Sequence, residues 1–316
     1  MKNGDRLTGE IKALDGGQLR LSTTSFGTIY VRWEDIRAIV SDKNVQLEVD
    51  TGKRYTGPIN TTEDDGILRV GGRGGDVEIA TKTIVRAVAL KSNESFFERV
   101  DGNATFGINF TESSGIGQMN AGLTADYRTA KYLVNTGFNA NISRERSGAT
   151  YNRGDISLGF QRFRPNRWYW TAISKAETNE ELGIDLRTSA GGGLGRYVWQ
   201  SNVGYYSLWL GASLSRENTV SQSESDNLTS AEGQINNTFT YYLFSPRKVN
   251  LKVDLDLMPS ITESNRVRTQ FDVELNWEIF TDFFWQLSYW SSTDSQPPDG
   301  AQGSDQGIVT SFGYTF

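Results

Sequence analysis

Two neighbouring stretches of the sequence, 249–257 and 267–279, carry charged or polar side chains at every second position and mostly apolar side chains between them. Because the side chains of a strand point alternately to opposite faces, each stretch predicts a strand with one polar and one apolar face. The polar faces would carry Asn250, Lys252, Asp254, Asp256, Arg268, Gln270, Asp272, Glu274, Asn276 and Glu278. A wall this rich in carboxylates would bias a pore toward cations or a polar solute, since charges of one sign focus the field in a low-dielectric channel.

The same residues allow a second interpretation, in which they fill a closed interior instead of lining a pore. The carboxylates of Asp254, Asp256, Asp272, Glu274 and Glu278 would then pair with the cations of Lys252, Arg268, Arg128 and Arg187. Barrels of about eight strands are filled by side chains, and barrels of about sixteen carry water. The strand number predicted below lies between these, and we favour the filled or nearly closed interior.

Cysteine and histidine are both absent from the 316 residues. A chain without them has no thiolate nucleophile, no Ser-His triad and none of the commonest zinc ligands. We therefore expect no catalytic site, no metal and no cofactor, and we set aside a lipid-handling enzyme as a third reading. The net charge of −6 counts against a nucleic-acid partner, which would require a basic face.

The elements that would position these side chains are long alternating segments that begin after residue 102. No apolar run of the length that a transmembrane helix requires occurs, which excludes such a helix. Most of the segments are long enough to cross a bilayer as tilted strands, which takes about 9 to 11 residues, and exceed the roughly 5 or 6 residues typical of soluble sheets. Twelve are predicted: 103–112, 118–129, 131–143, 154–163, 167–176, 184–198, 203–215, 234–244, 248–258, 267–279, 283–292 and 307–316.

The connections between these segments alternate between long polar and short tight stretches, as in outer-membrane barrels. Aromatic residues cluster beside the short ones, where Trp and Tyr prefer a membrane interface. An even number of strands places both ends of the barrel on the side of the short turns, which would be the periplasm. Among the long connections, 216–233 is the best candidate to fold into the interior, and the carboxylates of SKAETNEEL (174–182) are expected to be solvated.

The chain ends on an alternating aromatic strand, with Phe312, Tyr314 and Phe316 on one face. A terminal Phe on such a strand resembles the signal that bacterial outer-membrane proteins present to the barrel-assembly machinery. The expected partners are therefore outer-membrane lipid and, during biogenesis, that machinery. No secretory leader precedes the turn-like KNGD at residues 2–5, so an exported protein would correspond to the mature chain.

Residues 1–91 form a separate region with an internal repeat. GDRLTGEI (4–11) returns as GKRYTGPI (52–59), and IRAIV (36–40) corresponds to IVRAV (84–88). Short strands broken by Gly and Asp turn signals predict two SH3-like or Sm-like β repeats packed together. We expect this region to be a periplasmic domain, 92–101 a linker and 102–316 the barrel.

The chain resembles a family of uncharacterised bacterial outer-membrane proteins described as salt-induced, which carries domain of unknown function 481. The resemblance lies in KNGDRLTGEI (2–11), WEDIRAI (33–39), LGFQRFRPNRWYW (158–170) and DLRTSAGGGLGRYVW (185–199). It implies a periplasmic β unit followed by an outer-membrane barrel, and it brings no catalytic residues.

The predicted class is all-β, a twelve-stranded antiparallel transmembrane β-barrel preceded by a small two-repeat domain. We expect a narrow channel or a non-catalytic envelope scaffold with an acidic lumen wall. The alternative is a membrane anchor whose domain, residues 1–91, binds a periplasmic protein or assembles with copies of itself, since open small β units expose strand edges.

Overall fold

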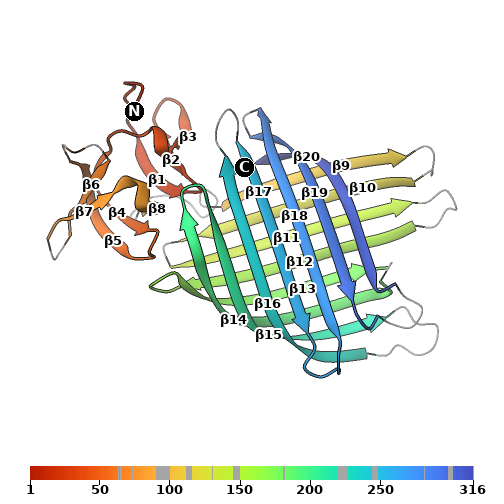
Figure 1. Ribbon diagram of the computed structural model, residues 1–316. Helices are drawn as coiled ribbons and strands as arrows, with labels where there is room; N and C mark the ends of the chain where they lie inside the picture. Colours follow the sequence, from red (N-terminus) through yellow and green to blue (C-terminus); the bar gives the residue numbers. More distant parts are fainter. Residues whose placement is uncertain are drawn as a thin grey trace.

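A computed structural model of the protein describes residues 1–62, 64, 66–72, 75–89, 100–111, 116–129, 131–144, 150–180, 182–219, 227–243, 248–280, 282–297 and 302–315. The regular elements of these residues are strands, apart from two short 3-10 helices. None of the helices in this part of the chain is long and apolar enough to cross a membrane. The strands form two bodies, an N-terminal sheet and a closed barrel (Figure 1).

The N-terminal sheet contains eight of the described strands in the order β3-β2-β1-β8-β4-β5-β6-β7. Its elements are β1 (Glu10–Asp15), β2 (Gln18–Thr23), β3 (Gly27–Arg32), η1 (Trp33–Asp35), β4 (Val40–Val49), β5 (Arg54–Thr61), β6 (Ile67–Val70), β7 (Val77–Ala80), η2 (Thr81–Thr83) and β8 (Ile84–Ala89). The repeat predicts that β1 to β4 correspond to β5 to β8. When each strand is replaced by its equivalent in the other repeat, the strand order reads the same from the opposite edge of the sheet. The sheet therefore has an approximate two-fold axis between β4 and β8.

The two repeats match down to their hydrogen bonds. The main-chain nitrogen of Trp33 donates to the oxygen of Gly17 at 2.8 Å, and that of Thr81 donates to Gly66 at 2.8 Å. The nitrogen of Lys2 donates to Asp35 at 2.8 Å, and in the second repeat that of Asp50 donates to Thr83 at the same distance. The predicted repeat is therefore present as repeated local structure.

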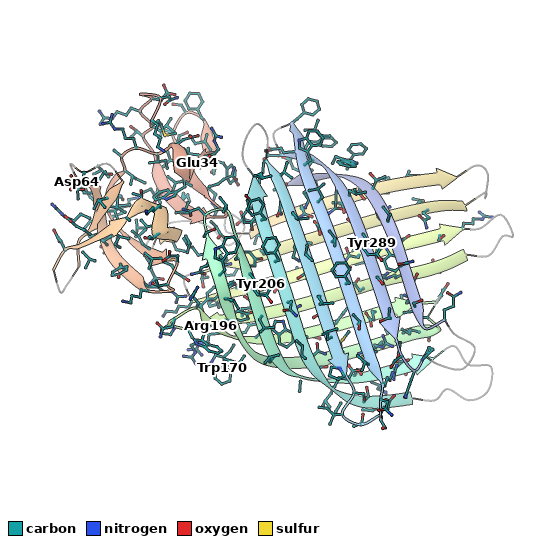
Figure 2. The ribbon with its side chains drawn as sticks, in the orientation of Figure 1. Glu34, Asp64, Trp170, Arg196, Tyr206 and Tyr289 are labelled. Carbon is teal, nitrogen blue, oxygen red and sulfur yellow. The ribbon has the colours of Figure 1, made fainter. Side chains whose placement is uncertain are left out.

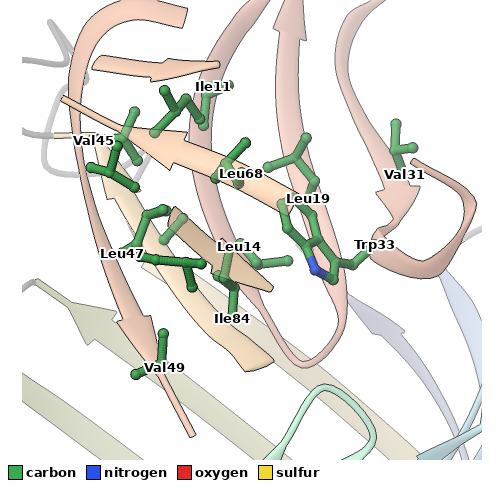
Figure 3. Close-up of a cluster of buried hydrophobic side chains, with 14 of the residues drawn as sticks. Ile11, Leu14, Leu19, Val31, Trp33, Val45, Leu47, Val49, Leu68 and Ile84 are labelled. Carbon is green, nitrogen blue, oxygen red and sulfur yellow. The ribbon is translucent and has the colours of Figure 1, made fainter. Parts of the chain in front are cut away.

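The sequence predicts two small β units packed together, and in the structure the two repeats share one sheet. β8, from the second repeat, pairs with β1 of the first, and β4 pairs with both β8 and β5. Each repeat thus supplies a strand that completes the other. One cluster of buried side chains fills the sheet, including Leu14, Leu47, Leu68 and Ile84 at 0% exposure (Figure 3). A single repeat buries too little apolar surface alone, and strand exchange gives both repeats a shared core.

The barrel is built from twelve described strands, each antiparallel to its neighbours. They are β9 (Val100–Thr111), β10 (Ile116–Arg128), β11 (Tyr132–Arg144), β12 (Thr150–Phe163), β13 (Trp168–Asn179), β14 (Ile184–Ser201), β15 (Gly204–Thr219), β16 (Asn227–Leu243), β17 (Val249–Pro259), β18 (Val267–Phe280), β19 (Phe283–Asp294) and β20 (Ser304–Thr315). β20 closes on β9, with Phe312 opposite Phe106 and Thr315 opposite Asn103. All twelve predicted strands are present.

The two strands on either side of the predicted loop 216–233, β15 and β16, are longer than predicted. β15 continues to Thr219 and β16 begins at Asn227, so residues 216–219 and 227–233 are strand and the predicted in-folding loop 216–233 is wrong. Residues 220–226 lie outside the described part, as do the predicted linker residues 92–99 and the terminal Phe316. The other linker residues, Val100 and Asp101, already belong to β9.

The N-terminal sheet sits against one end of the barrel (Figure 1). We call this the near end; it carries the short connections, the start of β9 and the end of β20, and the opposite side is the far end. The side chain of Gln200, on β14, donates to the main-chain oxygens of Val49 at 3.3 Å and Asp50 at 3.4 Å. Arg20 of the sheet pairs with Asp101 of β9 at 2.6 Å.

Candidate functional site: the barrel interior

The inward-facing side chains of the barrel bond across its interior. Lys175, on β13, donates to Gln270, on β18, at 3.2 Å, and Asn179, on β13, donates to Asp305, on β20, at 3.0 Å. These strands are not neighbours in the closed order β9 to β20, so the bonds pass through the enclosed space. The guanidinium of Arg153, on β12, lies 3.6 Å from the ring centre of Trp290, on β19.

Eight charged side chains gather toward the far end, and we call them the far-end cluster: Lys175, Glu177, Arg187, Glu217, Glu232, Arg266, Arg268 and Asp294. Arg187 pairs with Glu217 at 2.7 Å and with Glu177 at 3.0 Å. Arg266 bridges Asp294 at 2.6 Å and Glu217 at 3.2 Å. Arg268 pairs with Glu232 at 2.5 Å and approaches Glu177 at 3.8 Å.

Six of the eight side chains in the far-end cluster are almost excluded from solvent, while Lys175 and Glu177 are 25% and 21% exposed. The four cations, one Lys and three Arg, face the four carboxylates of the cluster and also Glu263, which pairs with Arg266 at 2.9 Å. The side chains of Arg266 and Glu217 are 3% and 4% exposed, and that of Glu232 is 1% exposed. Removing charges from water is expensive unless each one is paired and hydrogen-bonded, as these are. The arrangement therefore joins strands β13 to β16 to strands β18 and β19 through the interior.

The prediction that the wall carboxylates pair with Arg187 and Arg268 is wrong, because these arginines bind other carboxylates. Arg187 and Arg268 bind Glu177, Glu217 and Glu232. Lys252 pairs with Asp254 at 2.8 Å, but the two residues lie on one strand and do not pair across the barrel as predicted.

Amides hold most of the other predicted wall carboxylates near the middle of the barrel. Asn236 donates to Asp256 at 2.8 Å, and Gln270 donates to Asp272 at 2.9 Å. Glu274 accepts from Asn276 and from Gln286, both at 2.7 Å. Closer to the near end, Glu278 accepts from the main-chain nitrogen of Asp282 at 3.2 Å. The wall is thus a band of carboxylates satisfied by neutral donors.

Most members of the far-end cluster were not predicted from the sequence. Glu177 was expected to be a solvated loop carboxylate and is instead on β13, with its side chain 21% exposed. Glu217 and Glu232 were placed in a loop. The sequence did contain a sign that the strand continues through Glu217. Ser213, Ser215 and Glu217 keep the alternation of inward-facing polar residues along β15. The polarity of the flanking residues concealed it.

Side chains from both bodies meet at the near end. Phe163, at the end of β12, is buried with three guanidinium groups around its ring. Arg128 of β10 lies 4.6 Å from the ring centre, and Arg54 and Arg86 of the N-terminal sheet lie at 5.8 and 6.0 Å. Such cation–π contacts stabilise modestly at exposed sites and more when desolvated.

Asp15, at the end of β1, joins the two bodies at this point. It pairs with Arg86 at 3.1 Å and approaches Arg128 of the barrel at 3.9 Å. Burial works to raise the pKa of Asp15, but the charges of Arg86 and Arg128 outweigh it and hold the pKa below its ordinary value. The next residue, Gly16, packs against the ring of Tyr242 on β16. The predicted wall residue Arg128 therefore contacts the N-terminal sheet.

One cavity in the barrel interior is small. A cavity of about 110 Å³ lies among Lys175, Asp256, Gln270 and Arg268, next to the far-end cluster. This volume holds a few water molecules. In the described part of the chain, no three His, Cys, Asp or Glu side chains are arranged to hold a metal ion.

Solved structures with a similar outline include three bacterial proteins. The β domain of the Bordetella autotransporter BrkA is 9% identical, with 69% of this chain and 98% of that chain covered and a TM-score of 0.34. A bacterial polysaccharide outer membrane secretin is 8% identical, with 69% and 97% covered and a TM-score of 0.35. CdiB from Acinetobacter baumannii is 9% identical, with 90% and 67% covered and a TM-score of 0.27. At these identities no function transfers to this chain.

No curated protein matches the sequence. Residues 111–316, more than half of the chain, match the family described as "Protein of unknown function, DUF481". The description mentions neither salt nor a membrane, and the N-terminal stretches that carried part of the resemblance lie outside the match. The chain belongs to this DUF481 family.

Proposed function

We propose that this protein is an integral outer-membrane β-barrel that acts as a closed, non-catalytic anchor for its N-terminal domain. The barrel holds the domain at the membrane, and the domain faces the periplasm. The proposal is supported by the buried ion pairs of the far-end cluster at one end of the barrel and by the contacts of the N-terminal sheet at the other.

The outer surface of the barrel supports the membrane assignment. On β12, Ile156, Leu158 and Phe160 are 57%, 55% and 41% exposed, while Asp155, just before them, lines the interior cavity. Large exposed apolar patches mark protein or membrane contacts, and this one surrounds the barrel. Other exposed members include Phe106, Ile108, Met119, Phe138, Ile142, Leu194, Leu210, Leu214, Trp277, Leu287, Ile308, Phe312 and Tyr314.

Exposed aromatic residues at the near end support an interface there. Trp170 and Trp168 follow one short turn, and Phe280 and Phe283 flank another, with exposures between 38% and 70%. Figure 2 shows Trp170 and Arg196 at the barrel end beside the N-terminal sheet. Trp side chains prefer the membrane–water boundary, and outer-membrane barrels carry their short turns on the periplasmic side. This orientation faces the domain toward the periplasm.

The C-terminal strand supports export through the barrel-assembly machinery. Phe312 and Tyr314 are 53% and 55% exposed on β20, the strand that closes on β9. Their outward aromatic rings fit the expected assembly signal.

A planar-bilayer recording tests the closed anchor. The purified full-length protein, inserted into bilayers after its heat-modifiable gel migration is verified, should show no steady conductance at moderate voltage. Far-end variants that remove charge, such as Arg266→Ala with Arg187→Ala, should remain silent while the N-terminal sheet still covers the near end. A steady conductance from the unmodified protein would contradict the proposal.

A second candidate is a narrow cation channel that opens when the N-terminal sheet moves away. The band of carboxylates at Asp256, Asp272 and Glu274 favours it, because the hydrogen bonds that hold these carboxylates come from neutral amides. Such a channel would show rare openings with cation preference in asymmetric KCl, and Asp272→Asn with Glu274→Gln would reduce that preference.

The anchored domain has surfaces for a partner. β3 and β7 are the two edge strands of its sheet, and unpaired edges can accept a strand from another chain. We therefore keep partner binding or self-assembly through residues 1–91 as the role of the anchored domain. Cross-linking of the full-length protein in membranes tests it, and an exclusively monomeric, uncross-linked protein would count against it.

A further inference from the structure

A cleft of about 660 Å³ lies between the N-terminal sheet and the turn of the barrel at Asn202 and Val203. Its volume falls in the range of small-ligand sites, about 300 to 1,000 Å³. None of the residues that line it takes part in the far-end cluster or in the contacts around Phe163. The closed-anchor proposal leaves it without a role.

The internal repeat builds this cleft. Gly17 and Gly66 line it, and they are the equivalent turn residues that receive the equivalent hydrogen bonds from η1 and η2. The two 3-10 helices are joined where the indole nitrogen of Trp33 donates to the main-chain oxygen of Thr81 at 2.9 Å. The cleft walls are therefore rigid main chain from both repeats.

The lining is dominated by positive charge. Lys2, Arg37 and Lys82 face a single carboxylate, Glu34, so the lining carries three cations against one anion. Glu34 itself lies 3.7 Å from Arg32, and Figure 2 shows it on the N-terminal sheet. The main-chain bond from Lys2 to Asp35 holds Lys2 beside η1. The protein as a whole is negative, at −6, so this local excess is opposite to the average.

The barrel side of the cleft offers a polar atom and a route to the apolar surface. The side-chain oxygen of Asn202 is buried without a hydrogen-bond partner. Val203 is 41% exposed, and Trp199, three residues before Asn202, is 38% exposed on the barrel surface. An anionic group in the cleft could therefore carry an apolar portion that continues along the barrel surface.

We propose that this cleft binds a phosphate-bearing ligand, with Lys2, Arg37 and Lys82 around the phosphate. Ammonium and guanidinium groups bind phosphate oxygens through charge-assisted hydrogen bonds, which are stronger than neutral ones. The phosphate can belong to a lipid headgroup at the membrane surface or to a soluble phosphate ester. This inference goes beyond the proposed anchor role. It depends on the membrane location only if the phosphate belongs to a lipid.

Binding to the full-length protein in delipidated detergent micelles tests the proposal with two probes. Glycerol 3-phosphate represents the soluble source and is measured by calorimetric titration. Phosphatidylglycerol represents the lipid source and is measured by native mass spectrometry, with phosphatidylcholine as the lipid of no net charge. At least one probe should bind one site per chain.

Four substitutions make the test specific. Lys2→Gln combined with Lys82→Gln should weaken binding about tenfold, since two charge-assisted contacts are lost. Lys53→Gln, an exposed lysine of the same domain outside the cleft, should leave binding unchanged. Glu34→Gln should strengthen binding about threefold, because it removes the one like charge near the anion. Heat-modifiable migration shows that each variant is folded.

Each outcome decides the proposal. Binding of the lipid alone assigns the site to a headgroup, and equal binding of glycerol 3-phosphate assigns it to soluble phosphate esters. Absence of binding by both probes overturns the proposal, as does a double lysine variant that binds like the unmodified chain. A conducting barrel would overturn the closed anchor and leave this test unaffected.

Discussion

Gly52 of the N-terminal sheet lies directly against Arg167 of the barrel. A Cβ placed on Gly52 would come within 2.5 Å of the main-chain nitrogen of Arg167, and its φ of +79° already favours glycine. The repeat-equivalent residue, Gly4, has a φ of +93° and no atom within 4 Å of such a Cβ. The same turn is therefore used twice, once to contact the barrel and once in open space.

Comparing substitutions at Gly52 and Gly4 separates the loss of contact with the barrel from the strain that a side chain causes in the turn. Gly52→Ala and Gly4→Ala should each cost the sheet about 1 kcal/mol of strain. Only Gly52→Ala should push the sheet from the barrel, because only there does the new methyl group meet a main chain. Hydrogen exchange should accelerate at 49–53 and 164–167 in Gly52→Ala and stay unchanged at 164–167 in Gly4→Ala. Equal exchange in both variants would show that this contact does not hold the sheet.

The far-end cluster predicts a large loss of stability from one neutral substitution. Glu232→Gln leaves Arg268 without its closest carboxylate in a buried setting, and breaking such a pair costs about 3 to 5 kcal/mol. The folded band on unboiled gels should disappear at a clearly lower temperature or urea concentration. Glu180→Gln, an exposed carboxylate whose bonds to Asn152 an amide can partly replace, should change stability by a few tenths of a kcal/mol at most. If Glu232→Gln left the stability of the folded band unchanged, water would have to solvate the far-end cluster.

Asp15 predicts acid sensitivity of the N-terminal sheet. Its pKa in the folded protein is lower than the ordinary 3.8, so its stabilising contribution is complete above about pH 3.8 and is lost as the pH falls further. The side chain is half-exposed, so the effect is modest. Hydrogen exchange at β1 and β8 should be constant from pH 7 to about 4, after correction for intrinsic rates, and accelerate below. Asp15→Asn should lack this acid step; an unchanged step would assign it to another carboxylate.

Trp33 predicts that the two repeats depend on each other. Trp33→Phe removes the indole donor to Thr81 and leaves that oxygen with one partner fewer, which costs about 1 kcal/mol. Protection from exchange should fall at η2 and β8 as well as at η1. Trp168→Phe, on the exposed barrel surface, should leave both segments unchanged. Loss confined to η1 would show that the repeats unfold independently.

The strand pattern of the barrel was readable in the sequence. Segments 248–258 and 267–279 were predicted, and β17 and β18 occupy Val249–Pro259 and Val267–Phe280. Each strand has one apolar and one polar face, and that alternation is a local property of consecutive residues. The internal repeat of the N-terminal region was readable for the same reason, since equivalent turns reuse equivalent residues.

The partners of the interior charges were not readable. Arg268 meets Glu232 and Glu177, both of which lie on distant parts of the chain, because closure of the barrel and the stagger of its strands bring them to one level. The exchange of β4 and β8 between the repeats could not be predicted either. The turn and strand signals of each repeat are the same whether its last strand pairs within its own repeat or with the other one.

The sequence by itself determined how many strands the barrel has, where most of them lie, which face of the clearest strands is apolar and how often the N-terminal unit repeats, because these follow from spacing along the chain. The tertiary structure alone decided which charges neutralise one another, which strands the repeats exchange and where the N-terminal sheet meets the barrel. Those features depend on the distance between atoms in space, which the closure of the barrel and the packing of the sheet establish.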